Sequence, residues 1–436
     1  MDKRAADQRT IGGTNMRVFK FGGASIKDAE AVRNMVGIVK EYANEPLVIV
    51  VSAMEKTTNA LEEIVDLTIS GESQKAIEAL DKIKASHFAI STDLLRNDKK
   101  LESEINNIIV EVEWVIEDDP DKEKAMVYDQ IVGAGEMLST RIISAYLEKE
   151  GISNTWMDAR DLIQTDNTYQ DAKVNWEETS TRTINAINRA QKKSNVVITQ
   201  GFIGSSDDLM TTTLGREGSD FSAAILAFCT DAESVTIWKD VPGVMNADPK
   251  KFNDAELLPR ISYQDAVELA YFGTSVIHPK TIKPLQNKNI PLFVRSFSNP
   301  DLEGTRIDNE VNSSNIPSYI IREDQVIVSI HPRDFSFIVE SNLQDIFQDM
   351  SRLRIRSNVM QNSALSFSFS MDYDEAKLSA LQEAAGKNNE VRFNRGCRLL
   401  TVRYFNERIL EKLVGSAEIL LEQRTRNTVQ LVLKNQ

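Results

Sequence analysis

The pattern that most constrains the fold of this chain comes near its start. A short strand at residues 17–21 runs into a Gly22-Gly23 turn. Residues 28–42 then have the apolar spacing of a helix, and residues 47–51 (LVIVV) are apolar throughout, as in a parallel strand that is buried on both faces. A strand, a glycine turn, a helix and a second strand within about 35 residues predict a βαβ unit with a right-handed crossover.

A similar order of strand, glycine-bearing loop and helix recurs where the β-branched run at residues 196–199 precedes TTTLGREGSDFSAAILAFC, residues 211–229. Gly215 and Gly218 lie in the expected loop, and residues 221–229 form an apolar helical run. Such a junction offers backbone N–H groups and the positive end of a helix dipole to an anion. Taken alone, the stretch also fits an ordinary turn between a strand and a helix, so its interpretation depends on other loops of the same kind.

Further strands are expected at residues 155–157, 196–199, 235–238 and 290–296, with helical segments between them. Residues 61–118 form a long, largely helical tract, which we interpret as a lobe beside the sheet. Strands that alternate with helices in this way predict one α/β domain with a mainly parallel sheet over about 310 residues.

From residue 326 onward the elements become shorter and glycine becomes less frequent. Alternating strands and short helices suit one or two ferredoxin-like βαββαβ modules. The expected strands are residues 326–330, 365–371, 398–404 and 429–433, and the expected helices are residues 343–350, 375–385 and 407–413.

The composition excludes several classes of protein. A net charge of −14 argues against nucleic acid as a partner. Cys229 and Cys397 cannot build a disulfide framework, and three histidines without an HExxH motif do not suggest a zinc site. No run of about 18 apolar residues predicts a membrane span. Residues 1–15 are polar, as in an unstructured leader or a cloning remnant, so we expect a cytoplasmic protein.

Glycine-bearing turns follow three expected strand ends, at Gly22-Gly23, residues 201–204 and residues 215–218. In an open α/β sheet, ligands bind beyond the carboxyl ends of the strands. These turns therefore predict a polyphosphate cradle made mostly of backbone N–H groups, although neither GxxxxGK[ST] nor GxGxxG is present. Lys20 beside the first turn is suited to meet a phosphate, and a solvated lysine on an edge strand is the alternative.

Seven motifs carry a more specific signal. They are KFGGAS (20–25), VVSAMEKTTN (50–59), GAGEMLS (133–139), TQGFIGS (199–205), TTTLGREGSD (211–220), WKDVPGVMNADP (238–249) and FGTSVIHP (272–279). Together, and in this order, they resemble the motifs of aspartokinases, which belong to the amino-acid kinase family. The likeness covers nearly all of residues 17–307, and the C-terminal part resembles the paired ACT regulatory modules of that family.

This resemblance implies a fold and a division into domains. The fold would be an α/β, amino-acid kinase-like αβα sandwich with a mainly parallel sheet, followed by C-terminal ferredoxin-like (ACT) modules. The catalytic domain would span residues 16–310, with a helical lobe at about residues 61–125. Residues 316–436 would form two ACT-like modules for regulation and dimerisation, which implies a homodimer, with a tetramer as the alternative.

The resemblance also implies an activity. Aspartokinases transfer the γ-phosphoryl group of ATP to the β-carboxylate of L-aspartate, the first step toward lysine, threonine and methionine. This carboxylate has a reference pKa of about 3.9, so it is ionised at neutral pH and needs no general base. Catalysis would rest on positioning and on stabilising the charge of the transferring phosphoryl group. Mg²⁺ would be bound through ATP without direct protein ligands, except for a contribution from Asp220.

Matching positions suggest individual roles. Lys20 and Asp220 would be catalytic, with Lys20 holding the transferring phosphoryl group and Asp220 orienting that lysine. Arg216 would clamp the substrate α-carboxylate, and Glu136 would meet the substrate ammonium group. The other substrate-binding residues would be Thr58, Phe202 and Ser219. The ATP-binding residues would be Lys20, Gly22, Gly23, Ser52, Lys239, Asp240, Met245, Lys250 and Ser275.

Some positions depart from the family pattern. Ser275 stands where many relatives carry a lysine that reaches the nucleotide phosphates. Lys239 is the expected substitute, with Lys250 and Lys280 as alternatives. Glu217 replaces a frequent glycine and adds negative charge to an anion site, so we expect its side chain to point outward.

Structural alternatives exist for three assigned residues. Glu136 begins a helix, where an acidic side chain is favoured by the dipole alone. Arg216 could pair with Glu217 or Asp220, and Met245 could belong to the core.

Two rival functions follow from the same motifs. A kinase for glutamate or acetylglutamate would share the nucleotide site, but Glu136 in GAGEMLS together with the ACT-like tail favours aspartate. A catalytically idle amino-acid sensor would share the fold, but it need not retain Lys20, Glu136, Arg216 and Asp220.

Overall fold

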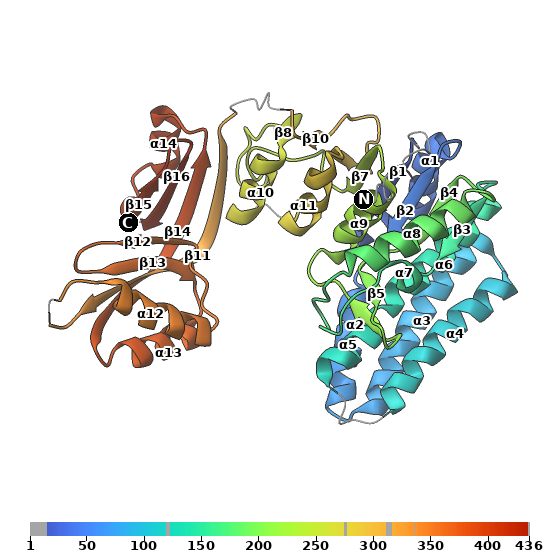
Figure 1. Cartoon of the computed structure of the whole chain (residues 1–436), viewed down its shortest axis with the longest axis horizontal. Helices are drawn as coiled ribbons and strands as arrows, with labels where there is room; N and C mark the ends of the chain where they lie inside the picture. Colours follow the sequence, from blue (N-terminus) through green and yellow to red (C-terminus); the bar gives the residue numbers. More distant parts are fainter. Residues whose placement is uncertain (1–14, 119–122, 274–276, 311–315, 335, 435–436) are drawn as a thin grey trace, which may run out of the picture. The chain divides into compact units, whose positions relative to one another are not determined.

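The computed structural model describes residues 15–118, 123–273, 277–310, 316–334 and 336–434 (Figure 1). The chain forms two compact units. The first unit comprises the described residues within Met1–Val244, Pro259–Val267 and Val276–Asn312. The second comprises the described residues within Met245–Leu258, Glu268–Ser275 and Ser313–Gln436. The expected leader at residues 1–15 lies outside the described residues except for Asn15, and the expected domain limits stay predictions.

The predicted βαβ unit is confirmed at the start of the first unit. β1 (Arg17–Phe21) pairs in parallel with β2 (Leu47–Val51), and α1 (Ala29–Tyr42) lies between them in the chain. Asp28 caps α1 by accepting a hydrogen bond of 2.8 Å from the backbone N–H of Ala31, which satisfies a free donor at the helix start. All residues of β2 are buried, as its apolar sequence predicts.

An eight-stranded sheet forms the centre of the first unit, in the order β3-β4-β2-β1-β7-β9-β10-β8. All neighbouring strands are parallel except β9 and β10, so the prediction of a mainly parallel sheet is confirmed. The other strands span Asn154–Met157 (β3), Val196–Gln200 (β4), Ser234–Lys239 (β7), Arg260–Ser262 (β8), Leu292–Ser296 (β9) and Thr305–Asp308 (β10).

Helices cover both faces of this sheet. Side chains alternate along a strand, so Phe19 and Phe21 of β1 face the core shared with α1 and α6, whereas Lys20 faces α9. The layer that contains α9 (Gly218–Thr230) also holds α8 (Trp176–Ala190) and α11 (Pro279–Lys288), while η1 (Gly23–Ile26), α7 (Ala159–Leu162) and α10 (Tyr263–Phe272) are short connecting helices.

A lobe of long helices, in blue to cyan in Figure 1, packs beside the sheet. Its helices contribute apolar residues to the same buried core as α1 and the sheet, in agreement with the amphipathic pattern of the sequence. They span Thr57–Ile69 (α2), Ser73–Leu95 (α3), Lys99–Glu117 (α4), Lys124–Val132 (α5) and Ala134–Lys149 (α6).

A small hairpin stands apart from the main sheet. β5 (Ile203–Ser205) and β6 (Thr211–Thr213) form a two-stranded antiparallel sheet between β4 and α9. Thr211–Thr213 leads into the glycine loop as predicted, but the sequence did not indicate that these threonines form a strand paired with β5. α9 then begins at Gly218, earlier than the apolar run at residues 221–229 indicated.

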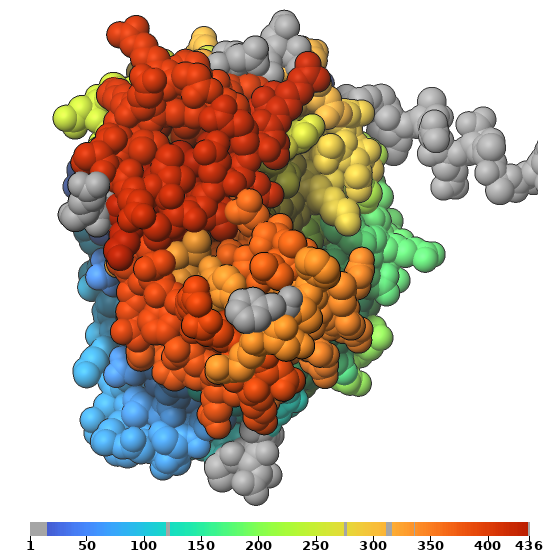
Figure 2. Space-filling model, turned by 90° about the vertical axis from the view of Figure 1, so that its left-hand side faces the viewer, coloured from blue at the N-terminus to red at the C-terminus, as the bar shows by residue number. Residues whose placement is uncertain are grey.

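The second unit contains a six-stranded antiparallel sheet, in the order β12-β13-β11-β14-β16-β15. β11 (Ser318–Pro332) and β14 (Asn389–Arg403) run through both halves of this sheet, and their pairing shifts register near Gln325. Helices α12 and α13 share a buried core with one half and α14 with the other, and the two halves adjoin on the surface coloured orange and red in Figure 2. The remaining elements span Glu340–Arg352 (α12), Val359–Asn362 (β12), Phe367–Asp372 (β13), Glu375–Ala385 (α13), Glu407–Val414 (α14), Glu418–Arg424 (β15) and Thr428–Lys434 (β16).

The sequence predicted only part of the second sheet. The expected strand at residues 326–330 lies in the second half of β11. The first half was not predicted, because Glu323 and Asp324 interrupt the apolar pattern. Asp324 also has a positive φ of 52°. β12 and β15 are edge strands with mostly exposed side chains, so neither shows the alternating apolar pattern of a half-buried strand. Among the described residues, no helix combines the length and the apolar character that crossing a membrane requires.

We expect the stability of the first unit to depend on Ile49, which is fully buried in β2. Ile49→Ala should lower the free energy of unfolding by about 2–5 kcal/mol, because it removes buried apolar surface and leaves a cavity. Ile184→Ala is the matched control on α8, where 41% of Ile184 is exposed, and should change it by less than about 0.5 kcal/mol. Urea unfolding followed by tryptophan fluorescence measures both, and equal effects would contradict this account of the core.

Candidate active site

A cavity of about 740 Å³ opens at the carboxyl ends of β1, β2, β4 and β7, within the first unit. Its wall includes Gly22 and Gly23 after β1, Ser52 after β2, Phe202 after β4 and Asp240 after β7. This is the sheet edge at which open parallel sheets bind ligands. The glycine turns that the sequence assigned to an anion site therefore meet in one cavity.

A group of buried charges lies in the cavity wall. The Nζ atom of Lys20 on β1 is 2.7 Å from Oδ1 of Asp220 on α9, and Nζ of Lys239 is 3.3 Å from Oδ2 of the same carboxylate. Only 10% of the Lys20 side chain and 2% of the Asp220 side chain are exposed. Burying either charge alone would be costly, so each stabilises the other.

The two lysines keep Asp220 ionised. Burial acts to raise the pKa of the Asp220 carboxyl, but the positive charges of Lys20 and Lys239 outweigh this effect and hold the pKa below its ordinary value. Asp220 is therefore a carboxylate at neutral pH. It fixes two ammonium groups at the surface of the cavity, where both can meet an anion.

The expectation that Glu217 points outward was wrong. Glu217 lines the cavity, and its Oε2 atom is 3.7 Å from Nζ of Lys239. Burial raises the pKa of Glu217, and although Lys239 opposes the shift, the neighbouring Asp220 adds to it. The positive charge of Lys239 makes a second carboxylate tolerable in an anion site, which the sequence pattern did not reveal.

Helix α9 directs its N-terminus at the cavity. Gly218 and Ser219 of the first turn lie in the wall, and the N-cap residue Glu217 makes no capping hydrogen bond with its side chain. The helix dipole and the N–H groups of such a turn suit an anion. Glycine is required at position 218, since a Cβ atom there would lie 2.6 Å from Cδ2 of Phe202.

Glu136 is a buried carboxyl group with an unsatisfied oxygen. It lies in the first turn of α6, only 3% of the residue is exposed, and its Oε2 atom has no hydrogen-bond partner among the described residues. Burial raises the pKa of Glu136 to about 8, although the backbone N–H of Ala53 and the charge of Lys20 oppose this shift. A buried acid that faces a cavity in this way is suited to a cationic ligand group, which would lower its pKa again.

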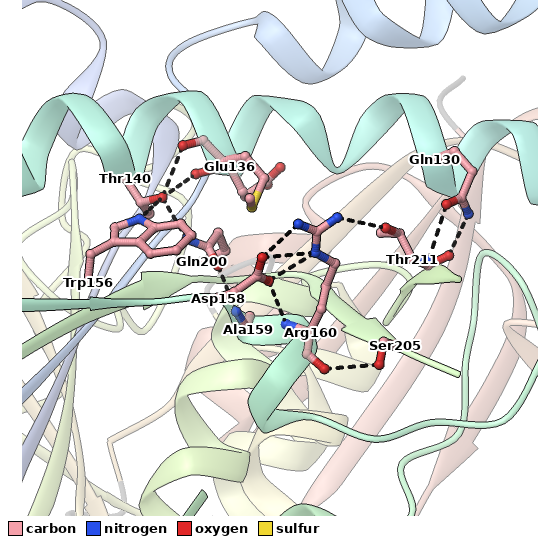
Figure 3. Close-up of polar contacts among 11 residues, drawn as sticks. Gln130, Glu136, Thr140, Trp156, Asp158, Ala159, Arg160, Gln200, Ser205 and Thr211 are labelled. Carbon is pink, nitrogen blue, oxygen red and sulfur yellow. Dashed lines mark hydrogen bonds and ion pairs between the residues drawn. The ribbon is translucent and has the colours of Figure 1, made fainter. Parts of the chain in front are cut away.

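Buried hydrogen bonds hold the helix of Glu136 in place (Figure 3). The Thr140 hydroxyl donates to the backbone carbonyl of Glu136 at 2.8 Å and accepts hydrogen bonds from Nε2 of Gln200 at 2.7 Å and Nε1 of Trp156 at 3.1 Å. Ser139 on α6 also donates to the carbonyl oxygen of Ser52 at 2.8 Å. α6 is thus tied to β3, to β4 and to the segment that follows β2, beside the cavity.

Arg216 differs from the other charged residues of the site because it is exposed. It lines the cavity, and no hydrogen bond or ion pair joins it to the described residues. The alternative in which Arg216 pairs with Glu217 or Asp220 is therefore not what the structure shows. Its guanidinium is available to a carboxylate ligand.

The structure brings most of the predicted site residues to this cavity, although their roles stay predictions. Met245 and Lys250 belong to the second unit, and Ser275 lies outside the described residues. Lys280 donates instead to Asp171, at 2.5 Å, and to the carbonyl oxygen of Leu214, at 2.9 Å. The predicted residues in the cavity wall are Lys20, Gly22, Gly23, Ser52, Thr58, Glu136, Phe202, Arg216, Ser219, Asp220, Lys239 and Asp240.

Four further polar residues line the cavity that the sequence did not indicate. These are Glu55, Glu62, Tyr128 and Gln170. The Tyr128 hydroxyl donates to Oε1 of Glu62 at 2.8 Å, joining α5 to α2. Glu55 lies within the motif at residues 50–59, although no role was assigned to it. No motif marks Glu62, Tyr128 and Gln170, because they reach the cavity through the packing of the lobe and through a loop. Within the described part of the chain, no cluster of three or more His, Cys, Asp and Glu residues could hold a metal ion.

Glu136 should make stability depend on pH. A carboxyl group whose pKa is raised to about 8 in the folded state contributes stability that is complete below its ordinary pKa of 4.5 and is lost as the pH rises to about 8. Between about pH 6 and pH 8, the free energy of unfolding of Glu136→Gln should therefore gain roughly 2 kcal/mol relative to the unsubstituted protein. Urea titrations at several pH values measure this.

The matched control for this prediction is Glu63→Gln, which changes an exposed glutamate on α2. Its pH profile should follow that of the unsubstituted protein. If Glu136→Gln also followed it, the buried carboxyl would not titrate as described.

Comparison with known proteins places these features in a family. Residues 15–296 match the amino acid kinase family. Lysine-sensitive aspartokinase 3 of Escherichia coli is 31% identical over 360 residues, which cover 81% of this chain and 78% of that protein. The chloroplastic bifunctional aspartokinase/homoserine dehydrogenase 1 of Arabidopsis thaliana is 32% identical over 314 residues, 69% of this chain and 33% of that protein. The chain thus spans about a third of the length of this bifunctional relative.

Solved structures extend the likeness to both units. Aspartokinase III of E. coli in complex with lysine and aspartate (T-state) superimposes with a TM-score of 0.81 at 26% identity, covering 96% of each chain. The same enzyme in complex with aspartate and ADP (R-state) gives a TM-score of 0.78, also at 26% identity and 96% coverage of each chain. The expected amino-acid kinase fold with a C-terminal ACT-like sheet is confirmed, and the chain belongs to the amino acid kinase family and, within it, to the aspartokinases.

Proposed function

We propose that this protein is an aspartate kinase, which transfers the γ-phosphoryl group of ATP to the β-carboxylate of L-aspartate and forms 4-phospho-L-aspartate. One observation carries the proposal. A single cavity holds two lysines beside a carboxylate, an unsatisfied buried Glu136 and an unpartnered Arg216. These groups complement a polyphosphate, an ammonium and a carboxylate. The aspartate and ADP bound to the E. coli relative support the same pair of ligands.

The anion-binding part of the cavity accounts for ATP. Lys20 and Lys239 supply positive charge, and the first turn of α9 with the Gly22-Gly23 turn supplies backbone N–H groups. Mg²⁺ bound with the nucleotide would neutralise part of the phosphate charge. Asp220 is the residue suited to help order that ion, since it remains a carboxylate in the wall of the cavity.

The remaining charges account for the amino acid. Glu136 meets the ammonium group, which supplies the cation that the buried carboxyl lacks in the protein itself. Arg216 clamps the α-carboxylate with two parallel hydrogen bonds. The side-chain carboxylate of aspartate is then free to approach the phosphoryl group held by Lys20. Thr58, Phe202 and Ser219 complete the wall of the substrate pocket.

The chemical step needs no proton transfer. An oxygen of the aspartate β-carboxylate forms a bond to the γ-phosphorus, while the bond from that phosphorus to the bridging oxygen of ADP breaks. The nucleophile is already ionised, so no general base is required. Lys20 and Lys239 offset the repulsion between two anionic reactants and the charge that spreads over the transferring oxygens.

We further propose, from the family resemblance, that residues 16–310 act as the catalytic domain. The location of the whole cavity in the first unit supports this division. Residues 316–436 would serve regulation and the pairing of two copies, and the product would enter the synthesis of lysine, threonine and methionine.

A substrate panel tests the proposal directly. ADP release is measured with L-aspartate, L-glutamate or N-acetylglutamate as the acceptor, each with and without lysine and threonine. We expect kcat/KM for aspartate to exceed the others by about a hundredfold, because an extra methylene misplaces the reacting carboxylate. Preference for glutamate would replace the proposal with the rival kinase. Absence of turnover with all three would favour the sensor.

Lys20→Ala should lower kcat for the preferred acceptor by at least about a hundredfold, since it removes the charge beside the transferring phosphoryl group. Lys27→Ala is the control, because Lys27 is a nearby lysine whose side chain is 55% exposed. It should retain the turnover of the unsubstituted enzyme. Far-ultraviolet circular dichroism checks that both variants fold, and near-normal turnover of a folded Lys20→Ala enzyme would refute the role of Lys20.

A further inference from the structure

A second buried carboxylate lies behind the cavity wall, and the reaction described above does not use it. Asp129 on α5 is fully buried. Within the described residues, its recorded partners are hydrogen-bond donors, and no cation is paired with it. A buried charge without a counter-ion is retained only where hydrogen bonds satisfy it. The segments to which Asp129 is hydrogen-bonded therefore indicate its role.

The donors to Asp129 come from two segments of the cavity wall region. Thr213 on β6 donates twice, from its backbone N–H to Oδ2 and from its hydroxyl to Oδ1, both at 2.7 Å. The backbone N–H of Gln170 lies 3.1 Å from each carboxylate oxygen. Gln170 itself lines the cavity and has a positive φ of 66°. One carboxylate thus joins α5, β6 and the loop at residue 170.

The next residue on α5 strengthens the same attachment. Gln130 donates from Nε2 to the backbone carbonyl of Thr211 at 2.7 Å and accepts from the Thr211 N–H at 3.2 Å, as Figure 3 shows. The Nη1 atom of Arg160 also lies 3.4 Å from the Thr211 hydroxyl. Asp129 and Gln130 therefore hold alternate residues of β6, which lacks a place in the main sheet.

The chain leaves this attachment and reaches Arg216 within a few residues. Thr213 is followed by Leu214 and Gly215, and a Cβ atom on Gly215 would lie 2.7 Å from Oδ1 of Asp171. Gly215 also has a positive φ of 74°. Its backbone thus packs directly on the loop that Asp129 orders. No hydrogen bond or ion pair anchors the Arg216 side chain among the described residues. The position of its guanidinium therefore depends on where the backbone of Arg216 is held.

We propose that Asp129 is a positioning residue for substrate binding, which holds β6 and Gln170 so that Arg216 meets the α-carboxylate of the amino-acid substrate. The inference rests on the proposed function for the identity of that substrate. Asp129 contacts neither substrate nor nucleotide in this account. Its effect belongs to the binding of the amino acid, whereas Lys20 and Asp220 serve the phosphoryl group.

The chemistry of the attachment explains why a carboxylate is used. An ionised carboxylate only accepts, so it can satisfy two N–H groups and one hydroxyl together. The isosteric amide would turn an NH₂ group toward one of these donors and leave it unpaired. Burial raises the pKa of Asp129 to about 6, although the hydrogen bonds from Thr213 and Gln170 oppose the shift, so the accepting form predominates at neutral pH.

Steady-state kinetics of Asp129→Asn test the proposal. We expect KM for L-aspartate to rise at least about tenfold, with KM for ATP and kcat within about twofold of the unsubstituted enzyme. Asp98→Asn is the matched control, because Asp98 also accepts hydrogen bonds from two backbone N–H groups, those of Lys100 and Leu101, but it caps α4 and is not part of the cavity wall. It should leave all three constants unchanged. A lowered kcat with an unchanged KM for aspartate would overturn the proposal.

A second variant covers the case in which Asp129→Asn does not fold. Thr213→Val removes only the hydroxyl donor and should raise KM for aspartate in the same direction, whereas Thr213→Ser should restore it. In a folded Asp129→Asn/Thr213→Val enzyme, the effect should be less than the product of the single effects, because both act through one contact. Independent, fully multiplicative effects would contradict the proposed contact.

Hydrogen exchange separates this proposal from the proposed function. The amides of Gln170 and Thr213 should lose protection in Asp129→Asn, or in Thr213→Val, without any ligand present, whereas amides of β2 should not. If the unsubstituted protein fails to phosphorylate aspartate, the proposed function fails, and exchange still reports on the attachment. Unchanged protection of both amides would overturn the positioning role whatever the substrate is.

Discussion

The buried ion pair between Lys20 and Asp220 is the interaction on which the rest of the site depends. It joins β1, near the middle of the parallel sheet, to the first turn of α9. Because both side chains are largely removed from water, loss of one would leave the other as an uncompensated charge. In a chain with a net charge of −14, this pair and Lys239 gather positive charge at the sheet edge where anions bind.

Glu136 and Arg216 leave charge unsatisfied in the same cavity, because neither Oε2 of Glu136 nor the guanidinium of Arg216 has a hydrogen-bond partner among the described residues. Burial of Glu136 works against stability, and a neutral residue would fold more favourably at that position. Groups that disturb folding in this way are typical of functional sites. A zwitterionic amino acid supplies both missing partners at once. The cavity therefore lacks one cationic and one anionic partner group, and a single ligand can supply both.

The sequence predicted the parts of the site that local order determines. Lys20 and Asp220 each lie beside a glycine turn at the end of a strand or the start of a helix, and such turns are visible in the sequence. Glu217 was placed wrongly because its neutraliser, Lys239, comes from a distant strand. β12 and β15 were not predicted because these exposed edge strands lack the alternating apolar pattern of a half-buried strand. These failures share one cause, which is that the deciding contact or exposure is not local.

Asp129 is the clearest example of a contact that local sequence does not reveal. Its hydrogen bond to Thr213 joins residues 84 positions apart, and neither residue lies in a motif that specifies the other. The sheet and its covering helices position the charged groups on β1, α6 and α9. Arg216 lies on a loop, which a few buried polar contacts hold in position instead. Local sequence thus specifies which charges the cavity can present, whereas non-local hydrogen bonds decide whether those charges meet a ligand at bonding distance.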